Sequence, residues 1–236
     1  MTLGGIYIPP IFKNSKTVMI DNRKNDSLVE REVAAFLDEH LYKNNEIIKE
    51  FARTDGINEQ VAGSDVILST ADGKLTRVVV DEKVASTQAN RNLGTFTLEL
   101  SFINKAGNRM CGWFTDMSKI TEYYLFGWIN KADIPYDAET KRWNTDMIRK
   151  DNIHELEWAI VSRKKILHFL EKKGWTFERL GRQDEKIRQN GCVVTKDFID
   201  DVAFRYSEKY KEKPVNLMLK KETYLKLSDY KGKIVC

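Results

Sequence analysis

The chain is poor in the residues that build disulfide frameworks and zinc sites. Its 236 residues include three histidines and three cysteines, and Cys111, Cys192 and Cys236 form no CxxC pair. Neither a disulfide scaffold nor a zinc ribbon is therefore expected, and an HExxH motif is absent. Any metal ion must be held mainly by carboxylates, which favours Mg²⁺ or Mn²⁺ over Zn²⁺.

Long apolar runs are also missing. No stretch approaches the ~20 residues that span a bilayer, and the N-terminus lacks the basic start and apolar core of a signal peptide. We therefore expect a soluble, cytoplasmic protein with no membrane partner. Hydrophobic residues make up 42% of the chain and charged residues 31%, as in ordinary globular proteins. The net charge of +4 permits a nucleic-acid partner without requiring one.

Hydrophobic periodicity predicts a mixture of helices and strands in one domain, residues 1–236. An irregular arm is expected over residues 1–25, with a short strand at 17–20. Asp26 or Ser27 is the expected N-cap of a helix that reaches about Phe51. Apolar residues recur at helical spacing along it, namely Val29, Val33, Phe36, Leu37 and Leu41. Strands are predicted over residues 66–69, 75–85, 95–103 and 109–114.

The second half of the chain is predicted to be mainly helical. Residues 120–129 fit a helix or a strand. Helices are predicted over 155–173, 198–210 and 221–227, and one strand over 214–219. We expect a catalytic core over residues 26–130, on which residues 131–236 pack as a helical C-terminal extension.

Three charged residues stand at the ends of two apolar runs at hairpin distance. Asp65 precedes the run 66–68, and Asp81 and Lys83 close the valine-rich run after the Asp72-Gly73 turn. Residues two apart in a strand share a face, so Asp81 and Lys83 project together and Asp65 can join them. Two carboxylates beside one ammonium can hold a hard divalent cation and steady an attacking water, which predicts a metal-dependent hydrolase of phosphodiesters.

Two further acids, Glu99 and Glu82, are an additional and an alternative candidate ligand. Glu99 lies on the polar side of the alternating strand 95–103, which is expected to neighbour the hairpin, and is a further candidate ligand. Glu82 alternates away from Asp81, unless a bulge flips the register and makes Glu82 the ligand. A charged end on a valine-rich strand can also be no more than a solvated edge, and that interpretation stays open.

The same residues carry a resemblance to a known family. Gln60, Gly63, Asp65-Val66-Ile67-Leu68 and Val80-Asp81-Glu82-Lys83 resemble the core signature of the PD-(D/E)xK nuclease superfamily, which includes many restriction endonucleases. The run 95–101 with Gly112-Trp113-Phe114 resembles uncharacterised bacterial and phage members. The resemblance covers residues 26–129, and Ser64 stands where the family name has proline.

The resemblance implies a restriction endonuclease-like fold, with a central mixed β-sheet flanked by helices, and Mg²⁺- or Mn²⁺-dependent cleavage of DNA. Asp65 matches the first acidic position, Asp81 the D/E of the second motif and Lys83 its lysine. Asp65 and Asp81 would hold the metal with Glu99 assisting, and Lys83 would position the water or stabilise the transition state. Gln60 would reach the phosphate or support the metal-bound water, or else be a surface glutamine.

Several alternatives stay open beside this expectation. The main one is a catalytically inactive nucleic-acid-binding or protein-interaction module on the same fold. Many nucleases of this kind cut duplexes as dimers, so a homodimer is also open, although no interface can be read from the sequence. Glu30 or Glu32 on the first helix could point at the site or face solvent. The aromatic residues between Trp113 and Trp128 are interpreted as core packing rather than a base-stacking platform.

Overall fold

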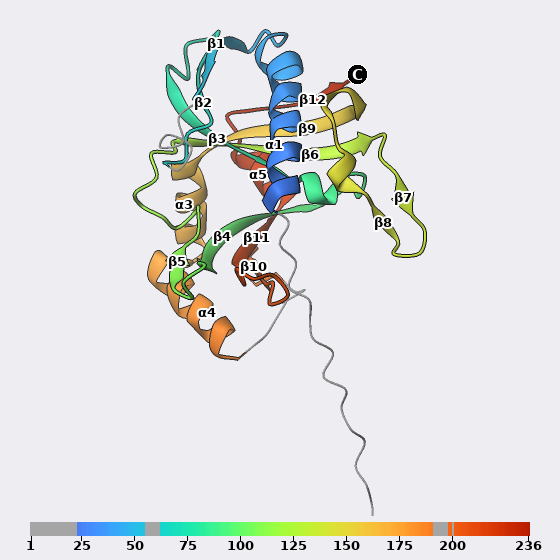
Figure 1. The fold of residues 1–236 in the computed structure, drawn as a ribbon. Helices are drawn as coiled ribbons and strands as arrows, with labels where there is room; N and C mark the ends of the chain where they lie inside the picture. Colours follow the sequence, from blue (N-terminus) through green and yellow to red (C-terminus); the bar gives the residue numbers. More distant parts are fainter. Residues whose placement is uncertain (1–22, 55–61, 191–197, 200) are drawn as a thin grey trace, which may run out of the picture.

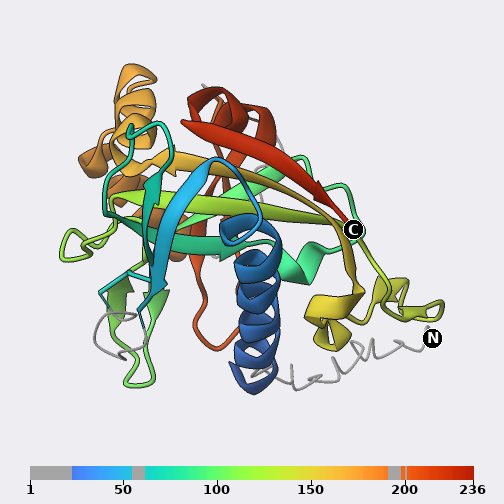
Figure 2. The same cartoon turned by 90° about the horizontal axis from the view of Figure 1, so that it is seen from above.

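The computed structural model describes residues 23–54, 62–190, 198–199 and 201–236. A twisted six-stranded sheet carries helix α1 (Arg23–Leu37) on one face, and a second sheet and further helices on the other (Figures 1 and 2). The predicted arm up to residue 22, with its short strand, lies outside the described residues. Within them, no helix is long and apolar enough to cross a membrane.

The six-stranded sheet has the order β1-β2-β3-β6-β9-β12. Its strands are β1 (Ile48–Arg53), β2 (Val66–Thr70), β3 (Val78–Val84), β6 (Tyr123–Ala132), β9 (Ile153–Ser162) and β12 (Tyr230–Val235). All neighbours run antiparallel except β3 and β6, which are parallel. The expected mixed sheet flanked by helices is therefore confirmed.

A second, antiparallel sheet has the order β10-β11-β4-β5. Its strands are β10 (Ala203–Tyr206), β11 (Val215–Lys220), β4 (Thr95–Ile103) and β5 (Arg109–Cys111). Strands β4 and β5 belong to the connection that carries the chain from β3 to its parallel neighbour β6, so this crossover is itself part of a sheet. A small hairpin pairs β7 (Tyr136–Asp137) with β8 (Arg142–Trp143).

The remaining helical segments cover the sheet faces and its ends. They are the π-helix η1 (Asp38–Tyr42), α3 (Arg163–Lys172), α4 (Phe177–Gln189), α5 (Lys221–Leu227) and the 3₁₀ turns η2 (Ser86–Gln88), η3 (Thr145–Met147) and η4 (Lys150–Asn152). Helix α4 has no counterpart among the predicted elements.

The core consists of two apolar clusters on opposite faces of the six-stranded sheet. One joins α1 to the face that carries Val80 and Leu125. The other joins the second sheet, α3 and α5 to the face that carries Tyr124 and Phe126. Successive strand residues point to opposite faces, so neighbouring residues of β3 face different clusters.

Two predicted helices are wrong in part. The first helix does not reach Phe51, because residues 48–53 form β1 and pair with β2. Asp26 and Ser27 lie at positions inside α1, after its first residue Arg23, and not at the position before the helix where an N-cap stands. The predicted helix 155–173 is strand β9 followed by α3. Strand β9 lies between β6 and β12, and most of its residues are buried, which leaves no clear two-residue alternation in its sequence.

The C-terminal part is not confirmed as a helical extension. It supplies β9 and β12 to the six-stranded sheet and β10 and β11 to the second sheet. The predicted helix 198–210 contains β10 instead. The predicted strand near 214–219 and the short helix 221–227 are confirmed as β11 and α5.

Candidate functional site

Strand β3 changes its surroundings halfway along its length. Residues 78–80 pair with β2 on one side, whereas residues 80–84 pair with β6 on the other. After Val80, β2 no longer pairs with this edge of β3. Asp65 takes its place there, because its Oδ2 accepts a hydrogen bond of 2.8 Å from the Glu82 N–H. Asp65 also donates its own N–H to the Val80 carbonyl at 3.0 Å. Asp65 is therefore fixed beside the open half of β3.

The segment that leads into Asp65 is held from two directions. The Thr54 N–H donates to the Asp65 carbonyl at 3.0 Å, and the Thr54 hydroxyl donates to the Ser64 carbonyl at 2.5 Å. Gly63 has a φ of +83°, and a Cβ there would collide with the Thr121 hydroxyl. Glycine is thus required at the bend that delivers Asp65.

Asp81 and Lys83 project from the same face of β3. The Lys83 ammonium donates a hydrogen bond to Asp81 Oδ1, and its nitrogen lies 5.1 Å from the centre of the Trp113 ring. Asp81 is only 4% exposed, whereas the Lys83 side chain is 24% exposed. The acid is therefore deep in the site, and its cation reaches toward solvent.

Asp65 and Asp81 influence each other directly. Burial raises the pKa of Asp81 to about 6, the charge and hydrogen bond of Lys83 oppose the rise, and the charge and hydrogen bond of Asp65 add to it. Two carboxylates thus share one nearby ammonium. Such a group carries an excess of negative charge and favours a proton or a metal cation.

Glu99 is not beside these two acids. The expectation that its strand neighbours the hairpin is wrong, because β3 pairs with β2 and β6 while β4 pairs with β11 and β5. Burial raises the pKa of Glu99, and a backbone hydrogen bond from Trp113 and the charge of Lys83 lower it. Glu99 is therefore related electrostatically to Lys83, from the opposite sheet.

The other sequence candidates lie in different places. Gln60 lies outside the described residues. Glu30 lines the cleft described below, whereas Glu32 accepts a hydrogen bond of 3.0 Å from the Lys150 N–H. In the described part of the chain, no three Asp, Glu, His or Cys side chains gather as a metal-binding group. Only Asp65 and Asp81 of the proposed ligands are brought together.

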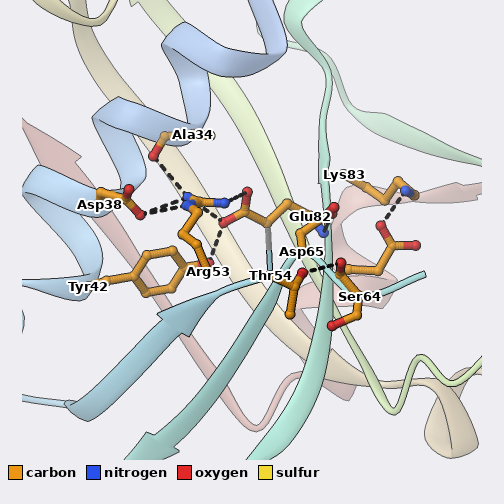
Figure 3. A network of polar contacts seen from close by, with 10 residues as sticks. Ala34, Asp38, Tyr42, Arg53, Thr54, Ser64, Asp65, Glu82 and Lys83 are labelled. Atoms are coloured by element: carbon orange, nitrogen blue, oxygen red, sulfur yellow. Dashed lines mark hydrogen bonds and ion pairs between the residues drawn. The ribbon is translucent and has the colours of Figure 1, made fainter. Parts of the chain in front are cut away.

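Glu82 faces α1, as strand alternation predicts in the absence of a bulge. Its carboxylate accepts hydrogen bonds from the Tyr42 hydroxyl at 2.6 Å and from Arg53 at 2.7 and 3.1 Å (Figure 3). Arg53 also donates to Asp38 and to the Ala34 carbonyl, both at 2.9 Å. Burial raises the pKa of Glu82, and Arg53 and Tyr42 lower it. We call Asp38, Tyr42, Arg53 and Glu82 the closed cluster.

Sequence reasoning missed the partners in the closed cluster. A glutamate at an inward position of a strand requires a cation, which is a signal that Glu82 has one. The sequence could not identify Arg53 as that cation, because the pairing depends on β1 being a strand.

A cleft of about 1210 Å³ opens beside this half of β3. It follows the chain from Asp81 to Gln88. One wall belongs to α1 and the other to the second sheet. Residues that line it include Ser27, Glu30, Arg31, Asp65, Asp81, Lys83, Thr95, Thr97, Trp113, Lys119, Arg205 and Met218.

The aromatic residues near the cleft belong mainly to the core. Phe114, Tyr124, Phe126 and Trp128 are at most 1% exposed, which confirms the interpretation as core packing. Trp113 is half-buried and is the member of the group that lines the cleft.

No family model, curated protein or solved structure matches this chain. A function for it must therefore be argued from the site itself.

Proposed function

We propose that this protein is a metal-dependent nuclease that hydrolyses DNA phosphodiester bonds, with a restriction endonuclease-like core. The observation that carries the proposal is the meeting of Asp65, Asp81 and Lys83 at the floor of one cleft. An enzyme of this kind would act in the cytoplasm, as a monomer or a homodimer.

The donor set fits Mg²⁺ or Mn²⁺. Mg²⁺ keeps several waters and is usually bound through one or two carboxylates, so a third protein ligand is not needed. The two acids have one ammonium between them, which leaves a negative charge for a cation to balance. When bound, the metal ion polarises a phosphoryl oxygen and makes its bound water more acidic.

Lys83 is placed to act on the substrate while it holds Asp81. An ammonium has three N–H donors, and one of them is used by Asp81 Oδ1. The side chain lines the cleft, so the remaining donors can bind a phosphate oxygen and offset the charge that develops there. Water attacks phosphorus and gives up a proton to solvent, the bond to the leaving oxygen breaks, and that oxygen takes up a proton, so the products are a phosphate monoester end and a hydroxyl end.

The test is cleavage of plasmid, linear duplex, single-stranded DNA and RNA with Mg²⁺ or Mn²⁺. Asp81→Asn and Lys83→Met should each lower the rate by roughly 10²–10⁴-fold. Asp151→Asn is the matched control, since its side chain is 82% exposed. Wild-type rates in both site variants would refute the site. DNA binding without cleavage would instead favour the inactive binding module.

A further inference from the structure

The wall of the cleft opposite Asp81 is formed by one face of the second sheet. Cross-strand partners lie on the same face, and Asn216 of β11 is opposite both Arg205 of β10 and Glu99 of β4. Met218 is likewise opposite Thr97. The intervening residues, such as Leu98 and Leu217, are buried in the core. Of this face, Thr95, Thr97, Arg205 and Met218 line the cleft, and Arg205 is the cation among them.

Arg205 differs from the other cations that line the cleft. Arg53 is held in the closed cluster, and Lys83 is paired with Asp81. Arg31 donates to the Ser27 carbonyl at 3.3 Å, and Lys119 also has an interaction partner. Arg205 is half-buried and lines the cleft, but its side chain has no hydrogen bond or ion pair with the residues that the structure describes.

An unpartnered, partly buried guanidinium is costly, and an anion in the cleft would remove that cost. Guanidinium binds phosphate through two parallel N–H···O bonds. Arg205 also lies on a sheet, and a strand holds a side chain more rigidly than a loop does. Arg205 is therefore placed to bind a phosphate in the same cleft as the acid pair.

We propose that Arg205 binds a backbone phosphate of the DNA strand whose scissile phosphate lies at Asp65 and Asp81. This inference rests on the proposed nuclease function and adds the second point at which the strand is held. The two sheets then have different roles. Strand β3 carries the reacting groups, and the second sheet sets the path of the DNA strand through the cleft.

The experiment measures binding of labelled single-stranded and duplex oligonucleotides in EDTA, over a series of salt concentrations. Arg205→Gln should weaken binding roughly tenfold and lower the slope of log K against log salt by ~0.7 for single strands or ~0.9 for duplex. Arg205→Lys keeps the charge and should keep the slope. The control is Arg142→Gln on the exposed hairpin, which has no ion pair with the described residues and should bind as wild type.

The outcomes separate the two proposals. Cleavage by wild type with an unchanged slope in Arg205→Gln would overturn the role of Arg205 alone. Binding without cleavage, with a reduced slope in Arg205→Gln, would overturn the nuclease and keep the phosphate site. Wild-type protein that neither binds nor cleaves would overturn both. Urea unfolding of each variant shows whether a loss of DNA binding reflects misfolding. A wild-type slope of log K against log salt in Arg205→Lys, beside a reduced slope in Arg205→Gln, identifies the charge as the cause.

Discussion

Asp81 and Glu82 are adjacent on β3, and both are shielded from water, yet they face opposite surroundings. Glu82 is enclosed by Arg53 and Tyr42, which donate three hydrogen bonds to its two oxygens. Asp81 has one cation, Lys83, and a second carboxylate, Asp65, beside it. The first group is complete within the chain. The second has two carboxylates for one ammonium and lines an open cleft, so on the proposed function a metal ion that enters the cleft would balance its charge.

The surroundings of Glu82 and Asp81 distinguish two kinds of buried charge. A buried charge whose partners are all internal holds elements together, here β1, β3 and η1. A buried charge crowded by a like charge lowers stability, and chains keep such groups where activity requires them. Removing a charge on one face of β3 should therefore lower the stability, and removing one on the other face should raise it.

Removal of Arg53 should have the largest effect on stability. Arg53→Met leaves Glu82, whose side chain is 10% exposed, without its cation, and should lower the free energy of unfolding by about 3–5 kcal/mol. Urea denaturation measures this change. The double variant Arg53→Met/Glu82→Leu should recover much of the loss. A loss below about 1 kcal/mol in the single variant would show that the cluster is not a buried ion pair in solution.

Asp81→Asn should act in the opposite direction. The raised pKa of Asp81, about 6, means that the folded state binds this proton more tightly than the unfolded chain. In metal-free wild type, stability should therefore fall as pH rises from about 4 to about 6. Asp81→Asn should remove this fall and be roughly 1–3 kcal/mol more stable than wild type at pH 7.

Thermal or urea unfolding in EDTA across this pH range tests the prediction. The two proteins should converge below about pH 4, where Asp81 is protonated in both states. An Asp81→Asn variant less stable than wild type at pH 7 would mean that Asp81 is a structural ion-pair partner, like Glu82.

Tyr42→Phe should have the smallest effect of the three. It removes one hydrogen bond of 2.6 Å to Glu82 while Arg53 still pairs with that carboxylate, so we expect a loss of about 1–2 kcal/mol. Denaturation by urea gives the value. Nuclease activity should stay at the wild-type level, and a large loss of activity without a loss of stability would show that the closed cluster also controls the site.

The sequence predicted those parts whose patterns are local. Polar and apolar residues alternate from Thr95 to Phe102 of strand β4, and the predicted bounds of the strand agree with the structure. Asp81, Glu82 and Lys83 face alternate sides as strand geometry requires. The sequence predicts a helix over residues 48–51 and again over residues 155–162, but these residues belong to β1 and β9, and only pairing with distant strands decides such segments.

The position of Glu99 shows what local patterns cannot give. The chain enters β4 soon after β3, which suggested neighbouring strands, since consecutive strands often pair. Strand β4 pairs instead with β5, which follows it, and with β11 from the far end of the chain. The sequence does not predict Arg205 as a site residue for the same reason, because nothing near it indicates that β10 and β3 border one cleft.

The strand order of the second sheet has a consequence for the order of folding. Strand β4 is made early in synthesis, but it pairs with β11 near the other end of the chain, and such non-local pairing forms slowly because a long loop must close first. The groove between the sheets can close only after most of the polypeptide has left the ribosome. A nascent chain would therefore carry Asp65, Asp81 and Lys83 well before the cleft wall that holds Arg205 is in place, and on the proposed function it would not bind DNA fully until it was nearly complete.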